Sequence, residues 1–224
     1  LQDVSHIVHL AAETGTGQSM YEIARYNEIN SQGTAILMDL LINEKDLTIQ
    51  QVVLASSRSV YGEGAYTFAD CDDKFTRVIP KGRSIERLES QLWDPICPIS
   101  KKALTPIPTR EDDPVNPASI YAATKLAQEE LVKISCSAKD IGYSILRFRN
   151  VYGEGQSLEN PYTGILSIFS TRIRRGMDLP IFEDGNETRD FVHVDDIANA
   201  VFACLNSNNK LDTVINVGSG KGTS

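Results

Sequence analysis

Two short apolar segments on either side of one amphipathic segment constrain the fold more than any other feature of this sequence. Residues 4–10 and 51–55 are apolar and have the length of buried strands, and residues 21–43 carry apolar side chains at helical spacing. A strand–helix–strand unit of this length closes by a crossover and therefore forms a parallel sheet. Residues 142–147 are typical of a third strand and follow a second long helical segment. We therefore predict an α/β fold.

Small or polar residues follow each predicted strand, at the end where open parallel sheets bind their ligands. The turn from Ala11 to Thr14 consists of residues that let a flat ligand approach the backbone. Ser57 follows the second strand and could bind a substrate hydroxyl. Asn150 follows the third strand and offers both a donor and an acceptor. The alternatives are an ordinary strand-to-helix turn and a serine-rich strand cap.

Residues 116–131 are predicted to start a long helix. Asn116 is suited to the N-cap and Pro117 to the first helical position. Tyr121 and Lys125 are four residues apart and therefore share one helical face. A fixed ammonium lowers the pKa of a phenol, and a shift of roughly 3 units corresponds to about 4 kcal/mol. Tyr121 is thus a candidate proton-transfer group, although this spacing also occurs by chance.

The charge balance limits the classes of partner. The 224 residues include 22 basic and 30 acidic ones, which gives a formal net charge of −8 and argues against nucleic acid or an acidic membrane as partner. The sequence shows no stretch of membrane-spanning length, and we expect no signal peptide. A small anionic ligand needs only one or two arginines. Arg189 can bind a phosphate oxygen, and the alternative is an ion pair with Asp190 or Glu187.

Residues 63–113 are rich in proline and charge and are interpreted as an insertion. They contain Cys71 and Cys97, but no second cysteine pair and no histidine that would complete a tetrahedral zinc site. We therefore predict no metal. The other two cysteines, Cys136 and Cys204, are scattered, and we expect all four to be reduced thiols in a cytoplasmic protein.

Six short motifs occur in order along the chain. They are His9-Leu10-Ala11-Ala12, Asn30-x-x-Gly33-Thr34, Ser56-Ser57-x-x-Val60-Tyr61-Gly62, Tyr121-x-x-x-Lys125, Arg147-x-x-Asn150-Val151-Tyr152-Gly153 and Arg189-Asp190-Phe191-Val192-His193-Val194-Asp195-Asp196. This ordered set resembles the extended short-chain dehydrogenase/reductase family, the NAD-dependent sugar-nucleotide epimerases and dehydratases. The branch that it resembles most contains dTDP-L-rhamnose 4-epimerases and UDP-glucose 4-epimerase-like proteins. The resemblance implies a Rossmann-like doubly wound parallel sheet with a small, partial C-terminal substrate domain.

The resemblance also implies a role for each site residue. Tyr121 would transfer the proton, Lys125 would lower its pKa and bind the nicotinamide ribose, and Ser57 would bind the sugar 4-hydroxyl. The function implied is 4-epimerisation of a dTDP- or UDP-hexose through a 4-keto intermediate in cell-surface polysaccharide synthesis, by a homodimer that pairs through the Tyr121 helix and its neighbour. The remaining implied contacts are Leu10, Ala11 and Ala12 with NAD, Thr14 and Asn150 with the sugar nucleotide, and Arg189 with its diphosphate.

Two departures from the family pattern refine this expectation. Dehydratases carry an Asp-Glu pair just after the Ser57 position, whereas this chain has Arg58-Ser59, so we favour an epimerase. In relatives in this branch the insertion carries Cys and His ligands, but Phe68 and Ser100 stand at such positions here, in agreement with no metal.

The glycine-rich G-x-x-G-x-x-G turn is also absent from the sequence, so we expect about 60 further residues, two βα units, before Leu1. We divide the chain into residues 1–62 and 114–155 (dinucleotide-binding), 63–113 (insertion) and 156–224 (partial substrate domain with returning Rossmann elements). The alternative functions are a catalytically incomplete scaffold, or a nucleotide-sugar reductase or dehydratase.

Overall fold

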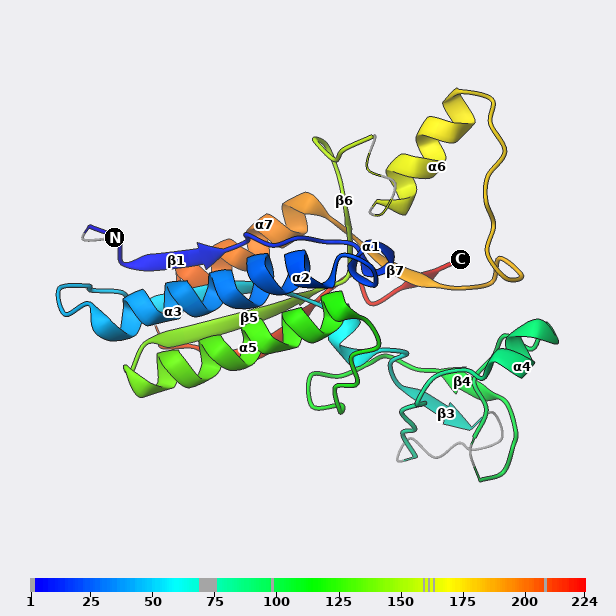
Figure 1. Cartoon of the computed structure of the whole chain (residues 1–224), viewed down its shortest axis with the longest axis horizontal. Coiled ribbons are helices and arrows are strands. Elements are labelled where there is room, and N and C mark those ends of the chain that lie inside the picture. The colour runs from blue at the N-terminus through cyan, green and yellow to red at the C-terminus, as the bar shows by residue number, and fades with distance from the viewer. Residues whose placement is uncertain are drawn as a thin grey trace.

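A parallel sheet with helices on both faces forms the body of the protein (Figure 1). The computed structural model describes residues 3–68, 76–97, 99–158, 160, 162, 164–207 and 209–224. The sheet is four-stranded, in the order β1-β2-β5-β8, and all of its pairs are parallel. This confirms the predicted α/β, Rossmann-like fold. The strands are β1 (His6–His9), β2 (Gln51–Ser57), β5 (Gly142–Phe148) and β8 (Asp212–Val217).

The central strands bury both of their faces, as a doubly wound sheet requires. Val52 and Leu54 of β2 point to α3 (Gly33–Asn43) and α5 (Ile120–Ala138). Val53 points to the opposite face, where Cys204 of α7 (Val194–Leu205) packs. Successive side chains on a strand alternate between faces, so one apolar run supplies two cores. Figure 1 shows α3 and α5 on one side of the sheet and α7 on the other.

The helical segment after β1 is more broken than the sequence predicts. It consists of α1 (Thr16–Ser19), α2 (Ile23–Tyr26), the π-helical segment η1 (Asn27–Gln32) and then α3. The continuous part therefore begins at Ile23. The π-helical segment places Asn30, which is fully buried, against the turn after β1: its amide accepts a hydrogen bond from the Glu13 nitrogen and donates to the Glu13 oxygen.

The start of the Tyr121 helix was predicted wrongly. Helix α5 begins at Ile120, and its N-cap is Ser119, whose hydroxyl accepts a hydrogen bond from the Ala122 nitrogen at 3.1 Å. Asn116 donates its backbone N–H to the Val60 oxygen at 2.9 Å instead. This tertiary hydrogen bond fixes the chain beside the 3₁₀ turn η2 (Arg58–Tyr61) and delays the helix by one turn.

The predicted insertion contains short elements of its own. Strands β3 (Tyr66–Phe68) and β4 (Leu104–Pro106) form an antiparallel pair, and α4 (Ile85–Glu89) lies near them. Cys71 lies outside the described residues. Among the residues that the structure does describe, no three His, Cys, Asp or Glu side chains gather in a way that could hold a metal ion. The predictions of no metal and of the domain boundaries stay predictions.

The C-terminal part brings further elements to the carboxyl ends of the sheet strands. Strand β6 (Asn150–Tyr152) pairs in parallel with β7 (Arg189–His193), which pairs with β9 (Gly222–Thr223). Helix α6 (Ile165–Arg174) stands apart from the sheet in Figure 1. In the described part of the chain, no helix has the length and apolar character needed to cross a bilayer.

Candidate active site

A cavity of about 430 Å³ lies beyond the carboxyl ends of β2 and β5. Its volume falls in the range of roughly 300–1,000 Å³ that is usual for small-molecule sites. The register of β2 and β5 pairs Ser57 with Phe148, so the residues that follow both strands face the same space. Five of the predicted site residues line it, namely Thr14, Ser57, Tyr121, Asn150 and Arg189. The predicted residues Leu10, Ala11, Ala12 and Lys125 do not line it.

Tyr121 is fixed in this cavity from two directions. Its backbone N–H donates to the buried Ser19 hydroxyl at 3.0 Å. Its ring meets the Tyr26 ring edge-on, with centroids 6.4 Å apart. Tyr26 is itself fully buried and donates its hydroxyl to the Thr14 oxygen at 2.7 Å. One buried tyrosine thus sets the positions of the candidate proton-transfer group and of the turn after β1.

The electrostatics around Tyr121 differ from the prediction. Burial raises the pKa of Tyr121 above 10, while a hydrogen bond with Ser57 and the positive charge of Arg58 act in the opposite direction. Lys125, which was expected to lower this pKa, instead donates from its ammonium to the Ala55 oxygen at 2.9 Å. The expectation of a lowered phenol pKa is therefore wrong for this structure, because burial outweighs the favourable charge.

Lys125 is one of the most deeply buried charged groups in the described structure, with 3% of its surface exposed. Burial lowers its pKa to about 8, and the Glu129 carboxylate opposes this shift. The ammonium has the Ala55 carbonyl as its hydrogen-bond acceptor at the carboxyl end of β2. Lys125 is therefore a group that can release its proton at mildly basic pH.

Ser57 is oriented by its neighbour. Its hydroxyl oxygen accepts hydrogen bonds from the Ser59 nitrogen at 3.2 Å and from the Ser59 hydroxyl at 2.9 Å. The Ser57 proton is consequently left to donate to Tyr121 or to a ligand. Ser57 also caps η2, as the alternative interpretation of a strand cap predicted. It lines the cavity as well, as the interpretation of a substrate-binding residue predicted.

Arg189 borders the cavity but is paired within the chain. Its guanidinium forms an ion pair with Glu187 and donates to the Thr188 oxygen at 2.9 Å. Asp190, the other partner considered from the sequence, accepts from Ser219 instead. The alternative of an ion pair with Glu187 is thus observed, and the diphosphate role of Arg189 stays a prediction.

A buried ion pair lies next to the site. Arg147 of β5 binds the Glu129 carboxylate of α5 with two hydrogen bonds of 2.9 and 2.7 Å. Ser56 donates to the same carboxylate. Arg147 also donates to the Tyr61 hydroxyl at 2.6 Å. Glu129 is fully buried, and this network links β2, β5, α5 and η2 through Ser56, the residue before Ser57.

Sequence reasoning missed two of the three arginines that line the cavity, Arg58 and Arg149. Arg58 was weighed only as a residue that cannot act as an acid, yet its Nε donates to the Asn150 Oδ1 at 3.2 Å. Its position directly after Ser57, at the carboxyl end of a parallel strand, is the signal that could have identified it.

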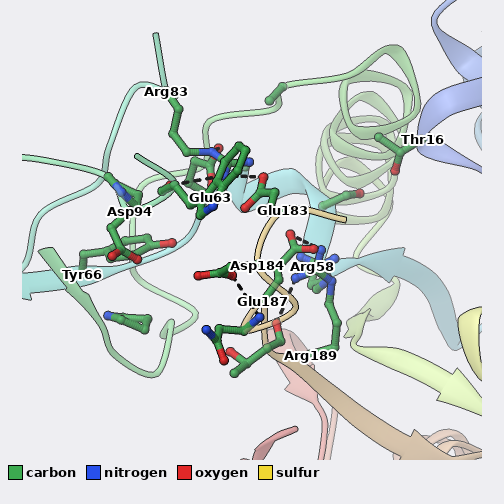
Figure 2. A pocket seen from close by; sticks show the side chains of 18 of the residues that line it. Thr16, Arg58, Glu63, Tyr66, Arg83, Asp94, Glu183, Asp184, Glu187 and Arg189 are labelled. Atoms are coloured by element: carbon green, nitrogen blue, oxygen red, sulfur yellow. Dashed lines mark hydrogen bonds and ion pairs between the residues drawn. The ribbon is translucent and has the colours of Figure 1, made fainter. Parts of the chain in front are cut away.

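Arg58 and Arg189 also belong to a second pocket of about 440 Å³ between the insertion and the segment before β7 (Figure 2). Tyr66 of the insertion lines the same pocket. Arg83 of the insertion binds Glu183 across it at 2.6 Å. The two arginines therefore stand where the two cavities meet.

The residues expected to hold NAD fit one side of a dinucleotide. Leu10 is 59% exposed at the end of β1 and is followed by the exposed, small Ala11. An exposed apolar side chain beside small residues offers a flat surface for a ring. The Lys125 ammonium is a donor suited to ribose hydroxyls. These residues are consistent with the ribose and nicotinamide part of the cofactor.

Comparisons with known proteins show which family the chain matches. The profile of the NAD dependent epimerase/dehydratase family matches residues 1–81 and 100–218. The chain is 44% identical over 220 residues to a dTDP-L-rhamnose 4-epimerase of Burkholderia thailandensis, which covers 97% of this chain and 57% of that protein. It is 31% identical over 224 residues to a putative UDP-glucose 4-epimerase of Methanocaldococcus jannaschii, covering 100% of this chain and 58% of the relative.

Among solved structures, the chain resembles the UDP-N-acetylglucosamine 4-epimerase of Methanobrevibacter ruminantium M1, which was determined in complex with UDP-N-acetylmuramic acid. The TM-score is 0.73 at 28% identity, and the match covers 99% of this chain and 57% of the other. The chain thus spans little more than half the length of the relatives it matches.

Proposed function

This chain belongs to the NAD dependent epimerase/dehydratase family, and from that premise we propose that it carries the catalytic groups of a nucleotide-sugar 4-epimerase. The proposed substrate is a dTDP- or UDP-hexose, and the proposed intermediate is its 4-keto form. The observation that carries the proposal is the cavity shared by Ser57, Tyr121 and Asn150. A hydroxyl, a phenol and an amide line this cavity, and all three can form hydrogen bonds with a polyhydroxylated ring.

In the proposed reaction, each group of the chain has a separate task. Tyr121 takes the proton of the sugar C4 hydroxyl as the ketone forms and returns it to the C4 oxygen afterwards. Ser57 donates a hydrogen bond that orients the C4 oxygen. NAD, when bound, supplies the acceptor and donor of the hydride. Lys125, with Leu10, Ala11 and Ala12, would hold the ribose and nicotinamide part of that cofactor, and Thr14 and Asn150 would bind the sugar nucleotide.

The residues after Ser57 favour epimerisation over dehydration. Elimination of water needs a carboxylic acid and a base beside the sugar, but Arg58 and Ser59 occupy these positions in the cavity. A guanidinium stays protonated and cannot act as the acid, and a serine hydroxyl is a weak base without a partner. We therefore favour epimerase activity over dehydratase activity.

The nucleotide and the sugar are proposed from the relatives. The 44% identity to a dTDP-L-rhamnose 4-epimerase favours a dTDP-6-deoxyhexose, used in cell-surface polysaccharide synthesis. A UDP-hexose is the second candidate, since the chain also resembles a putative UDP-glucose 4-epimerase.

We also propose a homodimer that pairs through α3 and α5. Ile36 and Leu40 of α3 are 53% and 44% exposed, and Ile134 of α5 is 68% exposed. The two helices pack side by side on the same face of the sheet (Figure 1). Exposed apolar side chains grouped on two neighbouring helices are typical of a protein interface.

A cytoplasmic location stays a prediction. The described cysteines Cys97, Cys136 and Cys204 are free thiols.

The test is an assay of the full-length gene product with dTDP- and UDP-hexoses, with NMR detection of the C4 epimer. An epimerase converts substrate without net use of added nicotinamide cofactor, whereas steady cofactor consumption would identify a reductase. The Tyr121→Phe variant should bind substrate but lose turnover. If wild type and variant are equally inactive on every nucleotide sugar, the scaffold alternative is favoured instead.

A further inference from the structure

Positive charge is concentrated at one wall of the candidate active site. Arg58, Arg149 and Arg189 all line the cavity that contains Tyr121. Arg189 forms an ion pair with Glu187. Within the described part of the chain, neither Arg58 nor Arg149 has a carboxylate within ion-pair distance. The wall therefore carries more positive charge than its own carboxylates balance.

The guanidinium of Arg58 is oriented but not saturated. Its Nε donates to the Asn150 Oδ1 at 3.2 Å, and the described contacts leave its two terminal nitrogens without a partner. A guanidinium held in this way presents two parallel N–H groups, which match two oxygens of a phosphate or a carboxylate. The Asn150 amide nitrogen is a further donor next to it.

The environment of Arg58 is unfavourable for a cation in the absence of an anion. Burial and, to a smaller extent, the charges of Arg189 and Arg149 lower the pKa of Arg58 to about 10, against a smaller opposing effect of Glu187. A half-buried cation beside two others costs free energy unless an anion joins them. Clusters of this kind are characteristic of binding sites.

We propose that Arg58 and Arg189 together bind the diphosphate of the nucleotide substrate, with Arg58 on the phosphate next to the sugar. This proposal rests on the proposed function, because it assigns a residue to that substrate. Arg58 directly follows Ser57, which would bind the sugar. It lies beside Arg189 in Figure 2, and both arginines line both pockets. A diphosphate lies between sugar and nucleoside, so a ligand that joins the two pockets passes these arginines.

The chemistry also allows a different anion at Arg58, namely the C6 carboxylate of a hexuronic acid. In that case Arg58 would select the sugar and leave the diphosphate to Arg189. The position of Arg58 beside Arg189 favours the diphosphate. The two possibilities differ in which ligand loses affinity when Arg58 is replaced, and this difference sets the experiment.

The test measures equilibrium binding to the purified full-length protein by isothermal titration calorimetry. The ligands are dTDP, UDP, thymidine, uridine and a UDP-linked hexuronic acid, and the variants are Arg58→Gln and Arg58→Lys. We expect Arg58→Gln to weaken binding of the preferred diphosphate about 10- to 100-fold, the usual effect of removing a charged hydrogen-bond donor. Binding of the phosphate-free nucleoside should stay unchanged. Arg58→Lys keeps the positive charge but lacks the two parallel N–H donors of the guanidinium. Its affinity for the diphosphate should therefore lie between those of the wild type and Arg58→Gln.

A matched control is Arg174→Gln, at an exposed arginine in the last turn of α6, which should bind dTDP or UDP like the wild type. Thermal melts of both variants show whether the fold is retained. Unchanged diphosphate affinity in a folded Arg58→Gln variant overturns the proposal, as does a loss confined to a nucleotide-linked hexuronic acid. A wild-type protein that binds neither diphosphate overturns it as well.

The binding readout separates this proposal from the proposed function. If the protein epimerises a nucleotide sugar but Arg58→Gln binds its diphosphate normally, only the role of Arg58 is refuted. If Arg58→Gln loses diphosphate affinity but no sugar nucleotide is epimerised, the diphosphate site stands and the 4-epimerase assignment fails.

Discussion

The ammonium of Lys125 donates a hydrogen bond to the carbonyl oxygen of Ala55, 2.9 Å away, and this bond fixes α5 to the carboxyl end of β2. Lys125 and Tyr121 share a helical face, as their spacing requires, but the lysine reaches down to the sheet while the tyrosine faces the cavity. The buried ammonium is stabilised by one carbonyl dipole and the more distant Glu129. Its protonation is therefore linked to folding.

This linkage predicts how stability depends on pH. The pKa of Lys125 is about 8 in the folded protein and 10.5 for a lysine in the unfolded chain, so the unfolded chain binds more protons between these pH values. Stability from this group therefore rises with pH across the window, by roughly 3 kcal/mol in total. In Lys125→Met, urea unfolding from pH 7 to 10.5 should lack this rise. Parallel wild-type and variant curves would contradict the assignment.

The buried pair between Glu129 and Arg147 predicts a large loss of stability when it is broken. Glu129→Ala leaves a buried guanidinium without its carboxylate, and we expect the free energy of unfolding to fall by about 3–5 kcal/mol. Replacing both partners, as in Glu129→Leu with Arg147→Met, should recover a large part of this loss. Urea unfolding with constant m-value measures it. The control is Glu130→Ala on the exposed side of the same helix, which should change stability by less than about 0.5 kcal/mol.

The sheet could be predicted from the sequence, whereas the start of the catalytic helix could not. Val52, Val53 and Leu54 form an apolar run that only a strand buried on both faces accommodates, so local sequence determines their place. Asn116 is a good N-cap by residue type, but its backbone N–H donates a hydrogen bond to the carbonyl oxygen of Val60, which lies 56 positions away in the sequence. A cap depends on such tertiary contacts, which local propensity does not contain.

The composition of the site was predicted better than its electrostatics. Thr14 and Ser57 were placed together because strand ends meet at one edge of a parallel sheet, and the structure shows both in one cavity with Tyr121. Helical spacing states that Lys125 lies one turn from Tyr121, but not where a long flexible side chain ends. Arg58 was missed as a charge near the phenol because its role depends on the path of the chain after β2, which η2 sets.

The exposed apolar side chains of α3 and α5 predict a dimer that single charges disrupt. Ile36→Glu and Leu40→Glu should shift the mass of the full-length protein from dimer to monomer, because a carboxylate buried in an apolar interface is not paired. Light scattering after size-exclusion chromatography measures the mass. Ile173→Glu on α6, where the isoleucine is 62% exposed on another part of the molecule, should leave the mass unchanged. A monomeric wild type would refute the interface.

The cation at Arg58 predicts a shift in the pH profile of the reaction. Its charge lowers the pKa of Tyr121, and so does the hydrogen bond from Ser57. Activity that needs the phenolate rises as pH passes the pKa of Tyr121, so the removal of either group should move this limb of the kcat/KM profile to higher pH. Arg58→Met should shift the limb upward, and Ser57→Ala should shift it in the same direction.

The pH profile distinguishes an effect on Tyr121 from a loss of substrate binding. A variant that only weakens binding lowers kcat/KM by the same factor at every pH, whereas a raised Tyr121 pKa lowers it most at the acidic end. Because Arg58 is also proposed to hold the diphosphate, Arg58→Met should show both effects, and the exposed-site variant Arg174→Gln should show neither. Ser57→Ala keeps the arginine, so its shift isolates the hydrogen bond. Profiles that are displaced vertically but keep the same midpoint in all variants would mean that neither group sets the protonation of Tyr121.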